Sequence, residues 1–379
     1  MKKKKRKIFE ELADKYRGGG AEPRCPHFGT CGGCMFQSVP YEGQLMIKRD
    51  YLNSLFDGML SLEGVSSSDA FGYRNRMDMV TAFGKMGLRE AGSYKFVVDV
   101  ESCPIMQEKS CGLMQKARPP VRQIEDYDYL RHRGYLRYLV FRQARFTGEC
   151  MVNFVVARDE DLLDTVIEAV APETDSISVI LSDGLADLSF GPVIRTVKKG
   201  FIIEEFDGIS YRVTPNSFFQ SNSPVARQMY RRIKDCVKGR VLDLYSGVGS
   251  ISLYVAGECE SVTGVEEVPE AVDTAMLNRD ENRIANADFV CSDVKEFMKN
   301  TEDTFDTLIL DPPRSGMNPK VVKYINAMRP GRIIYMSCNP AAFRQEMELL
   351  EGYGVEFFEA YDMFPQTPHV ETLALLTRK

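Results

Sequence analysis

From about residue 213 to residue 379, short apolar segments alternate with longer stretches of helical character. Neighbouring parallel strands need a helical crossover between them, so this alternation predicts a doubly wound α/β sheet. A sheet of this kind binds its ligand in the crevice at the carboxyl ends of its strands. The expected strands cover residues 240–245, 261–266, 288–291, 305–311 and 332–337.

The chain before residue 213 divides into three regions of different character. Residues 1–24 form a basic, flexible tail, and residues 25–105 carry cysteines at both ends around a helical segment at 40–56. Residues 106–212 contain short alternating strands, which predict a mainly β domain that faces the substrate. The strands of this domain are expected at 138–145, 150–156, 178–182 and 201–204.

The composition narrows the class of protein. No apolar run approaches the length of a membrane span, and the basic N-terminus lacks the apolar stretch of a signal peptide. We therefore expect a cytoplasmic protein without a membrane partner. Ten cysteines in such a chain indicate metal binding and reactive thiols more than disulfides. The net charge of −6 does not indicate a nucleic-acid partner, but RNA contact needs only one basic face.

Two local runs can supply that basic face. One is Lys2–Lys7, and the other is Arg131–Tyr138 with Arg142 and Arg145, which interleaves arginine and tyrosine without an acidic residue. Such a pattern suits phosphate contact combined with base stacking. The alternatives are a half-buried strand with solvated arginines for the second run and a solubilising terminus for the first.

A strand-to-helix turn at Asp243–Ser250 has the features of a nucleotide cofactor site. Its two glycines let the backbone approach a ligand closely, although Ser252 occupies the third glycine position of the dinucleotide motif. Glu266 ends the next strand, where an acidic group can bind ribose hydroxyls. Asp293 ends the third strand, where it can face an adenine ring. A dinucleotide oxidoreductase would share the glycine turn and the acidic residue at the end of the next strand.

Two later strand ends decide against an oxidoreductase. Asp311–Gly316 follows the fourth strand, and Ser337–Pro340 follows the fifth. This layout is typical of enzymes that use S-adenosyl-L-methionine, and it places the Cys338 thiol beside the expected cofactor. Glu371 precedes a further apolar strand at 373–376.

Cys338 and Glu371 together suit methyl transfer to a carbon atom. Carbon 5 of uracil is a poor nucleophile until a thiolate adds to carbon 6, and a base must later remove the carbon 5 proton. Cys338 is the candidate nucleophile and Glu371 the candidate base. Taken singly, such a cysteine is more often a buried small hydrophobe and such a glutamate a solvated turn residue. Their joint placement around one crevice favours catalysis.

These segments resemble the RNA uracil-5-methyltransferase family, which makes 5-methyluridine in tRNA and in large-subunit rRNA. The resemblance covers nearly the whole chain, from Cys25 to the C-terminus, and implies a Rossmann-like methyltransferase domain. It is carried by motifs at Cys25–Cys34, Asn216–Gln220, Asp243–Ser250, Asp311–Gly316, Ser337–Pro340 and His369–Glu371.

The resemblance also implies roles for individual residues. Cys338 matches the nucleophile and Glu371 the base. Asp311 is expected to accept the N3–H of uracil, because a carboxylate there faces a lone pair on cytosine. Arg314 occupies the position where RNA cytosine-5 enzymes carry their cysteine. Ser250 departs from the asparagine of many relatives. The donor-binding positions are Gln220, Tyr245, Glu266 and Asp311, and the positions near the target base are Phe218, Gln220 and Asp311.

Four cysteines form a candidate metal site. Cys25, Cys31 and Cys34 are separated by five and two residues, and Cys103 is the best fourth ligand. Four thiolates suit either zinc or an iron–sulfur cluster, and the spacing does not separate the two. The family resemblance favours a 4Fe-4S cluster with a structural or RNA-positioning role.

We therefore expect S-adenosylmethionine-dependent methylation of uridine C5 in structured RNA through a covalent cysteine–C6 adduct. Large-subunit rRNA of the 23S type is the favoured substrate, because the residues before Cys25 are too few for the β-barrel RNA-binding domain of many relatives. The T-loop uridine of tRNA is the alternative. A cluster-containing redox enzyme would need a second glycine-rich loop, and a non-catalytic RNA-binding module would not need both Cys338 and Glu371. No obligate protein partner is expected.

Overall fold

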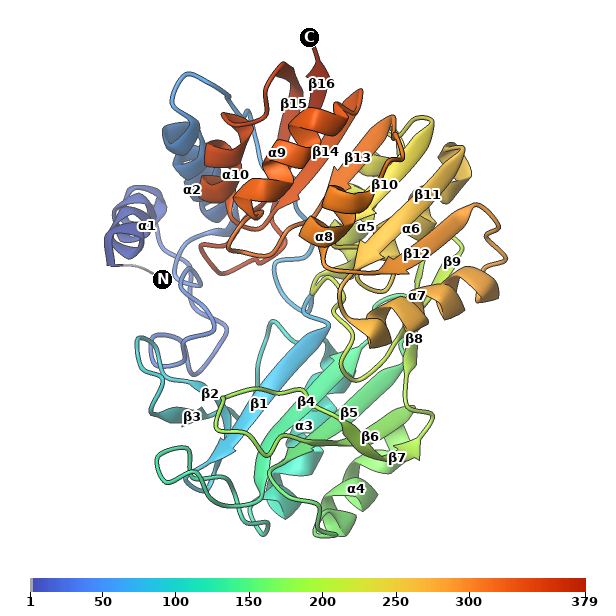
Figure 1. Cartoon of the computed structure of the whole chain (residues 1–379). Helices are drawn as coiled ribbons and strands as arrows, with labels where there is room; N and C mark the ends of the chain where they lie inside the picture. The colour runs from blue at the N-terminus through green and yellow to red at the C-terminus, as the bar shows by residue number, and fades with distance from the viewer. Residues whose placement is uncertain (1–2) are drawn as a thin grey trace.

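Two seven-stranded sheets dominate the computed structural model, which describes residues 3–379 (Figure 1). One sheet belongs to the C-terminal part of the chain and the other to the central part. Met1 and Lys2, at the start of the expected basic tail, lie outside the described residues. No helix among residues 3–379 is both long enough and apolar enough to cross a membrane.

The C-terminal sheet has the strand order β12-β11-β10-β13-β14-β16-β15. Its first five strands are parallel, whereas β16 runs antiparallel between β14 and β15. This order confirms the doubly wound α/β sheet expected from the alternation. The strands are β10 (Arg240–Leu244), β11 (Ser261–Glu266), β12 (Ala287–Cys291), β13 (Thr307–Leu310), β14 (Arg332–Ser337), β15 (Tyr353–Tyr361) and β16 (Glu371–Arg378).

Apolar residues on both faces of this sheet explain its unbroken apolar strands. Successive side chains point to opposite faces, so Val241 joins one core and Leu242 the other. Helices α5 (Ser223–Lys234), α6 (Ser250–Val255) and α7 (Pro269–Glu281), with the short 3-10 helix η2 (Ala256–Glu258), cover the first face. Helices α8 (Val294–Asn300), α9 (Pro319–Met328) and α10 (Pro340–Met347) cover the second.

The N-terminal helices α1 (Lys3–Tyr16) and α2 (Tyr41–Phe56) pack on the second face as well. Helix α2 confirms the helical segment expected at 40–56. The tail expected to be flexible is instead a packed helix from residue 3, because Phe9 is fully buried with its ring centroid 4.6 Å from that of Tyr51. The apolar side chains Phe9 and Ala13 give this basic helix a face that the core can bury.

The central sheet has the order β3-β2-β1-β4-β5-β6-β7. Its strands are β1 (Arg76–Ala82), β2 (Lys85–Arg89), β3 (Val97–Asp99), β4 (Leu136–Gln143), β5 (Cys150–Val156), β6 (Ser176–Leu181) and β7 (Val193–Lys198). The boundary expected at residue 105 is therefore wrong, because β1 pairs with β4 and the first three strands belong to this sheet. Pairing with β1 also covers an edge of β4 that would otherwise be open.

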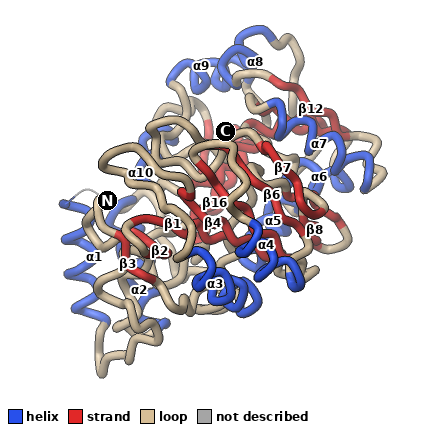
Figure 2. Tube along the Cα trace, turned by 90° about the horizontal axis from the view of Figure 1, so that it is seen from below, coloured by secondary structure: helices blue, strands red, loops and turns tan. Residues whose placement is uncertain are grey.

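One face of the central sheet is covered by α3 (Glu108–Val121) and α4 (Asp164–Val170), followed by the 3-10 helix η1 (Ala171–Glu173). Figure 2 shows α3 and α4 side by side on this face. A separate two-stranded sheet, β8 (Ile202–Phe206) and β9 (Ile209–Val213), packs on the C-terminal domain through Phe206 and Tyr211. The strand expected at 201–204 thus belongs to this pair.

Candidate functional site

The glycine turn after β10 lies at the carboxyl edge of the C-terminal sheet. Its backbone is held by Glu266, whose carboxylate accepts hydrogen bonds from the N–H groups of Gly247 and Val268, both at 3.0 Å. Gly247 has a φ of +55°, and a Cβ added there would meet nothing within 4 Å. The space above Gly247 is therefore open to a ligand. Gly249 starts α6 with a φ of +76°, where a Cβ would overlap the Phe289 ring.

Other predicted cofactor residues border the same turn. Tyr245 is half-buried and has a φ of +68°, which is rare for a residue with a side chain and is common at functional sites. Ser250, the departure from the family pattern, shares a 2.9 Å hydrogen bond with the Tyr230 hydroxyl. Asp293 is exposed and caps α8 by accepting from the Glu296 N–H at 3.0 Å. Its contact with adenine stays a prediction.

Asp311 and Gln220 meet beside this turn. The Gln220 side-chain amide donates to the Asp311 carboxylate at 3.2 Å. The backbone of Gln220 is fixed as well, because its main-chain carbonyl accepts from the Asn75 side chain at 2.7 Å. Burial and the negative charge of Asp243 raise the pKa of Asp311 to about 8. Sequence reasoning missed Asn75, which lies in no motif, and it named Asp243 only as the start of the glycine turn.

Cys338 and Glu371 lie at one edge of the sheet, as the sequence predicted. Cys338 follows β14 and Glu371 begins β16, and the antiparallel pairing of Ser337 with Thr372 brings their positions together. Glu371 is buried, and burial followed by the charge of Asp311 raises its pKa well above the usual range. Burial and the charges of Glu371 and Asp311 raise the pKa of the half-buried Cys338 thiol to about 11. A thiol and two carboxyl groups are thus assembled at one edge of the sheet.

Arg314 is the cation of this edge. Its charge acts against the carboxylates, and it lowers the pKa of both Cys338 and Glu371 from what burial alone would give. The Asn339 side chain donates to the Arg314 carbonyl at 2.9 Å. This hydrogen bond joins the loop that follows β13 to the loop that follows β14. The sequence comparison used Arg314 only to exclude a cysteine. The sequence did contain a signal for this electrostatic role, because Arg314 is a cation in a loop that follows one strand while the candidate thiol follows the next strand.

An exposed groove lies between the central domain and the residues that follow β11. It has a volume of about 500 Å³ and is lined by Phe190, Pro192 and Val193 of the central domain and by Val268 and Glu270 beside the cofactor turn. Phe218, predicted near the target base, is 68% exposed. Exposed aromatic rings next to a crevice are suited to stacking against unpaired bases.

Two of the five arginines in the arginine–tyrosine run are structural, which corrects part of the expected basic face. Arg137 is fully buried and donates to the carbonyls of Gly184 and Ala186 at 2.7 and 2.6 Å. Arg142 is also buried and donates to the Ser217 carbonyl. Both arginines lie on β4, which is paired with β1 on one side and with β5 on the other, so their side chains are enclosed by the central domain. Residues 131–133 and Arg145 are exposed, and their contact with RNA stays a prediction.

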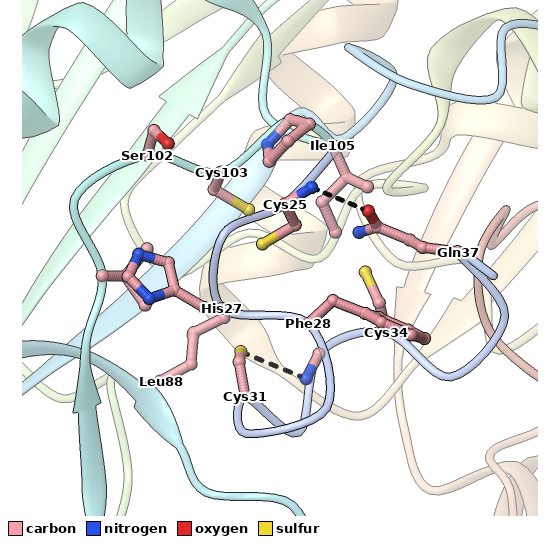
Figure 3. Close-up of a pocket in the computed structure, with 13 residues that line it drawn as sticks. Cys25, His27, Phe28, Cys31, Cys34, Gln37, Leu88, Ser102, Cys103 and Ile105 are labelled. Carbon is pink, nitrogen blue, oxygen red and sulfur yellow. Dashed lines mark hydrogen bonds between the residues drawn. The ribbon is translucent and has the colours of Figure 1, made fainter. Parts of the chain in front are cut away.

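The four predicted metal ligands surround one pocket. Figure 3 shows the sulfur atoms of Cys25, Cys31, Cys34 and Cys103 directed into the same space. The loop that carries the first three is tied to the segment of Cys103 by a 3.1 Å hydrogen bond from the Glu101 N–H to His27. Apolar side chains complete the lining, among them Phe28, Leu88, Val100 and Ile105.

The arrangement of these thiols differs from a site for one metal ion. Within residues 3–379, no three histidine, cysteine or acidic side chains converge closely enough to hold a single ion. Tetrahedral zinc needs such convergence. In an iron–sulfur cluster each cysteine binds a different iron, so the four sulfurs lie farther apart. The 4Fe-4S cluster implied by the family resemblance therefore stays a prediction.

Comparisons with known proteins show which family the chain resembles. A family model described as tRNA (uracil-5-)-methyltransferase matches residues 196–379. The tRNA (uracil(54)-C(5))-methyltransferase of Pyrococcus furiosus is 37% identical over 358 residues, which cover 94% of this chain and 85% of the relative. An RNA methyltransferase of Clostridium tetani, described as uncharacterized, is 34% identical over 99% of this chain and 88% of its own.

A solved structure extends the similarity to three dimensions. The crystal structure of Pyrococcus abyssi tRNA (uracil-54, C5)-methyltransferase in complex with S-adenosyl-L-homocysteine superposes with a TM-score of 0.80 and 34% identity. The match covers 91% of this chain and 86% of that chain. These relatives are named for tRNA, whereas the sequence led us to expect large-subunit ribosomal RNA as the target. That expectation relied on the length of the segment before Cys25, and this length does not indicate which RNA enters the site.

Proposed function

The chain belongs to the RNA uracil-5-methyltransferase family, and on this premise we propose that it methylates carbon 5 of the T-loop uridine of tRNA with S-adenosylmethionine as the donor. The observation that carries the proposal is the convergence of Cys338, Glu371 and Asp311 at the carboxyl edge of one sheet. The preference for tRNA rests on relatives whose names specify uracil 54 of tRNA.

In the proposed reaction, the Cys338 thiolate adds to carbon 6 of the uracil, and the ring electrons move to the carbon 4 oxygen as an enolate. Carbon 5 then forms a bond to the sulfonium methyl carbon of the donor, whose sulfur leaves with the former bonding pair. Glu371 takes the proton from carbon 5, and the C6–S bond breaks to restore Cys338. Asp311 orients the ring through the uracil N3–H.

The residues present fit the methyl donor. Glu266 lies at the end of the strand beside the glycine turn, where a carboxylate binds ribose hydroxyls, and the space above Gly247 is open. S-adenosylmethionine supplies an electrophilic methyl group when it is bound. Gln220 and Tyr245 are the further side chains expected to hold it. The Gln220 amide also reaches Asp311, so it links the donor site to the base site.

We propose that the pocket of Cys25, Cys31, Cys34 and Cys103 holds a 4Fe-4S cluster, because the four thiols line one space and the family resemblance implies such a cluster. Anaerobically purified protein should then contain about four iron atoms per chain. Cys34→Ser should lose most of this iron, whereas Cys236→Ser, at a buried thiol remote from the pocket, should keep it. Zinc in place of iron would reject the assignment.

The substrate is tested by methyl incorporation from labelled S-adenosylmethionine into two unmodified transcripts, a whole tRNA and a large-subunit rRNA fragment. Label recovered as 5-methyluridine in the tRNA alone is the expected result. A tRNA whose T-loop target uridine is replaced by cytidine is the matched control and should stay unlabelled. Label in the rRNA fragment alone would reject the tRNA proposal while keeping the chemistry.

A further inference from the structure

Residues 362–370 form an irregular loop between β15 and β16 that leads directly into Glu371. The loop is buried along most of its length. Irregular backbone in the interior has no strand ladder to fix it, so its position depends on the hydrogen bonds that other segments supply. The Glu371 backbone is paired with Tyr361 of β15, so whatever holds this loop constrains the approach of the chain to Glu371 and, with it, the placement of its carboxylate.

The N-terminal part of the chain supplies several of these hydrogen bonds at Gln366. The backbone N–H groups of Met35 and Phe36 donate to its carbonyl at 2.8 and 3.1 Å. The Gln44 amide donates to the Gln366 side chain at 2.9 Å and accepts from its N–H at 3.0 Å. Gln366 is buried with a φ of +68°. Such a conformation persists only where the surrounding contacts hold it.

A buried ion pair holds the start of the same loop. The Lys48 ammonium pairs with the Asp362 carboxylate, and both side chains are fully buried. Lys48 also donates to the Phe364 carbonyl at 3.0 Å, and the Tyr41 hydroxyl donates to Asp362 at 2.8 Å. A buried pair of this kind fixes geometry more than it adds stability. Helix α2 thus contacts the loop at its start and, through Gln44, at its middle.

We propose that Gln44, Lys48 and Tyr41 of α2 are positioning residues for Glu371. The inference rests on the proposed function, in which Glu371 takes the carbon 5 proton. In that step the electrons of the C5–H bond form the C5–C6 double bond, and the C6–S bond breaks to release the Cys338 thiolate. A displacement of about 1 Å at a catalytic group can slow its step on the order of a hundredfold. Loosening the loop therefore slows proton removal while methyl transfer continues.

The same contacts join the loop to the cysteine pocket. Cys34 directly precedes Met35, and the Gln37 side chain in the pocket accepts from the Cys25 N–H at 3.0 Å. Tyr73, which packs in one apolar cluster with Cys34 and Cys103, donates to the Pro365 carbonyl at 3.0 Å. The pocket and the Glu371 loop therefore form one continuous structural unit, which gives the N-terminal region a role in the release step.

The test compares Gln44→Leu with Gln107→Leu in the full-length protein. Gln107 is a matched control, because it is equally buried and donates to the Gln143 carbonyl at 2.9 Å in the central domain. Each protein is mixed with labelled S-adenosylmethionine and tRNA transcript, and the covalent protein–RNA adduct is quantified on denaturing gels. Glu371→Gln and the wild type are run beside them.

Gln44→Leu should accumulate methylated adduct, as Glu371→Gln does, with kcat reduced on the order of tenfold to a hundredfold. Its KM for tRNA should change little, and Gln107→Leu should show no adduct. Tyr41→Phe removes one hydroxyl and should give a smaller adduct signal if Gln44→Leu does not fold. Adduct levels equal to those of Gln107→Leu in both variants would overturn the inference. No adduct in Glu371→Gln would instead reject Glu371 as the base, and the positioning role with it.

Discussion

The side-chain amide of Gln220 lies 3.2 Å from the Asp311 carboxylate, although 91 residues separate them in the chain. Asp311 follows β13, and Gln220 lies just before α5. The hydrogen bond fixes the orientation of a carboxylate that burial keeps partly protonated near neutral pH. In the proposed reaction, recognition of the substrate base therefore depends on the ionisation of Asp311.

Asp311→Asn should lower kcat/KM for tRNA about tenfold to a hundredfold, because a hydrogen bond to a charged group is lost. The ratio of wild-type to variant kcat/KM should rise with pH up to about 8, where Asp311 becomes ionised, and stay constant above. Taking the ratio removes the contribution of the Cys338 thiolate. The exposed Asp288→Asn is the control and should give a flat ratio. A flat ratio for Asp311→Asn would contradict its role.

The reactivity of Cys338 should report the charges around it. Alkylation by iodoacetamide should accelerate about tenfold per pH unit from pH 7 to 10, since the thiolate is the reactive form and its pKa is about 11. Glu371→Gln removes a charge that raises this pKa, so it should react faster at pH 8. Arg314→Ala should react slower. Exposed Cys291 is the internal reference, followed by mass spectrometry of its peptide. Equal Cys338 rates in all three proteins would refute the electrostatic coupling.

Breaking the buried ion pair should destabilise the fold strongly. Lys48→Met leaves the Asp362 charge buried without its cation, which should lower the free energy of unfolding by about 3–5 kcal/mol. The double variant Lys48→Met with Asp362→Leu should recover most of the loss. Lys15→Met, at an exposed pair with Asp50, should cost at most about 1 kcal/mol. Urea denaturation provides the comparison, and equal losses for both lysines would show that burial of the pair does not matter.

The exposed and buried arginines should behave differently towards RNA. Replacing Arg131 and Arg133 together by alanine should reduce the slope of log affinity against log salt by about 1–2, because two cations that can reach phosphates are lost. Arg137→Ala should leave that slope unchanged and expose the loop around residues 184–186 to proteolysis. An unchanged slope for the first variant would exclude this loop from the RNA interface.

The C-terminal domain could be predicted from sequence because its signals are local. Each parallel strand is a short apolar run, and each polar group that follows it is carried to the same edge of the sheet. Strands β11 and β14 match the expected ranges in full. The sequence alone predicted that Cys338 and Glu371 lie near the same sheet edge, because Cys338 follows one apolar strand and Glu371 precedes another. The choice of RNA could not be predicted in this way, because the segment before Cys25 says nothing about the base that enters the site.

The central part of the chain was harder to predict for a physical reason. The pairing of β1 with β4 joins segments about sixty residues apart, and local pattern does not indicate which strand a given edge accepts. The burial of Arg137 has the same origin. An arginine–tyrosine run indicates a basic surface in the sequence. In the structure, the carbonyl groups of Gly184 and Ala186 accept hydrogen bonds from Arg137 and so compensate for the burial of its guanidinium group.

The sequence by itself determined the chemistry of this protein, because a thiol, a carboxylate and a glycine turn at strand ends define which reaction the sheet edge can support. The tertiary structure decided which groups control that chemistry. Lys48 and Asp362 are 314 residues apart, and their contact exists only because α2 packs against the last strands. Contacts at such separation follow from how whole elements pack, and no local periodicity records them. The contacts of Lys48 and Gln44 with the loop before Glu371 could therefore be found only from the tertiary structure.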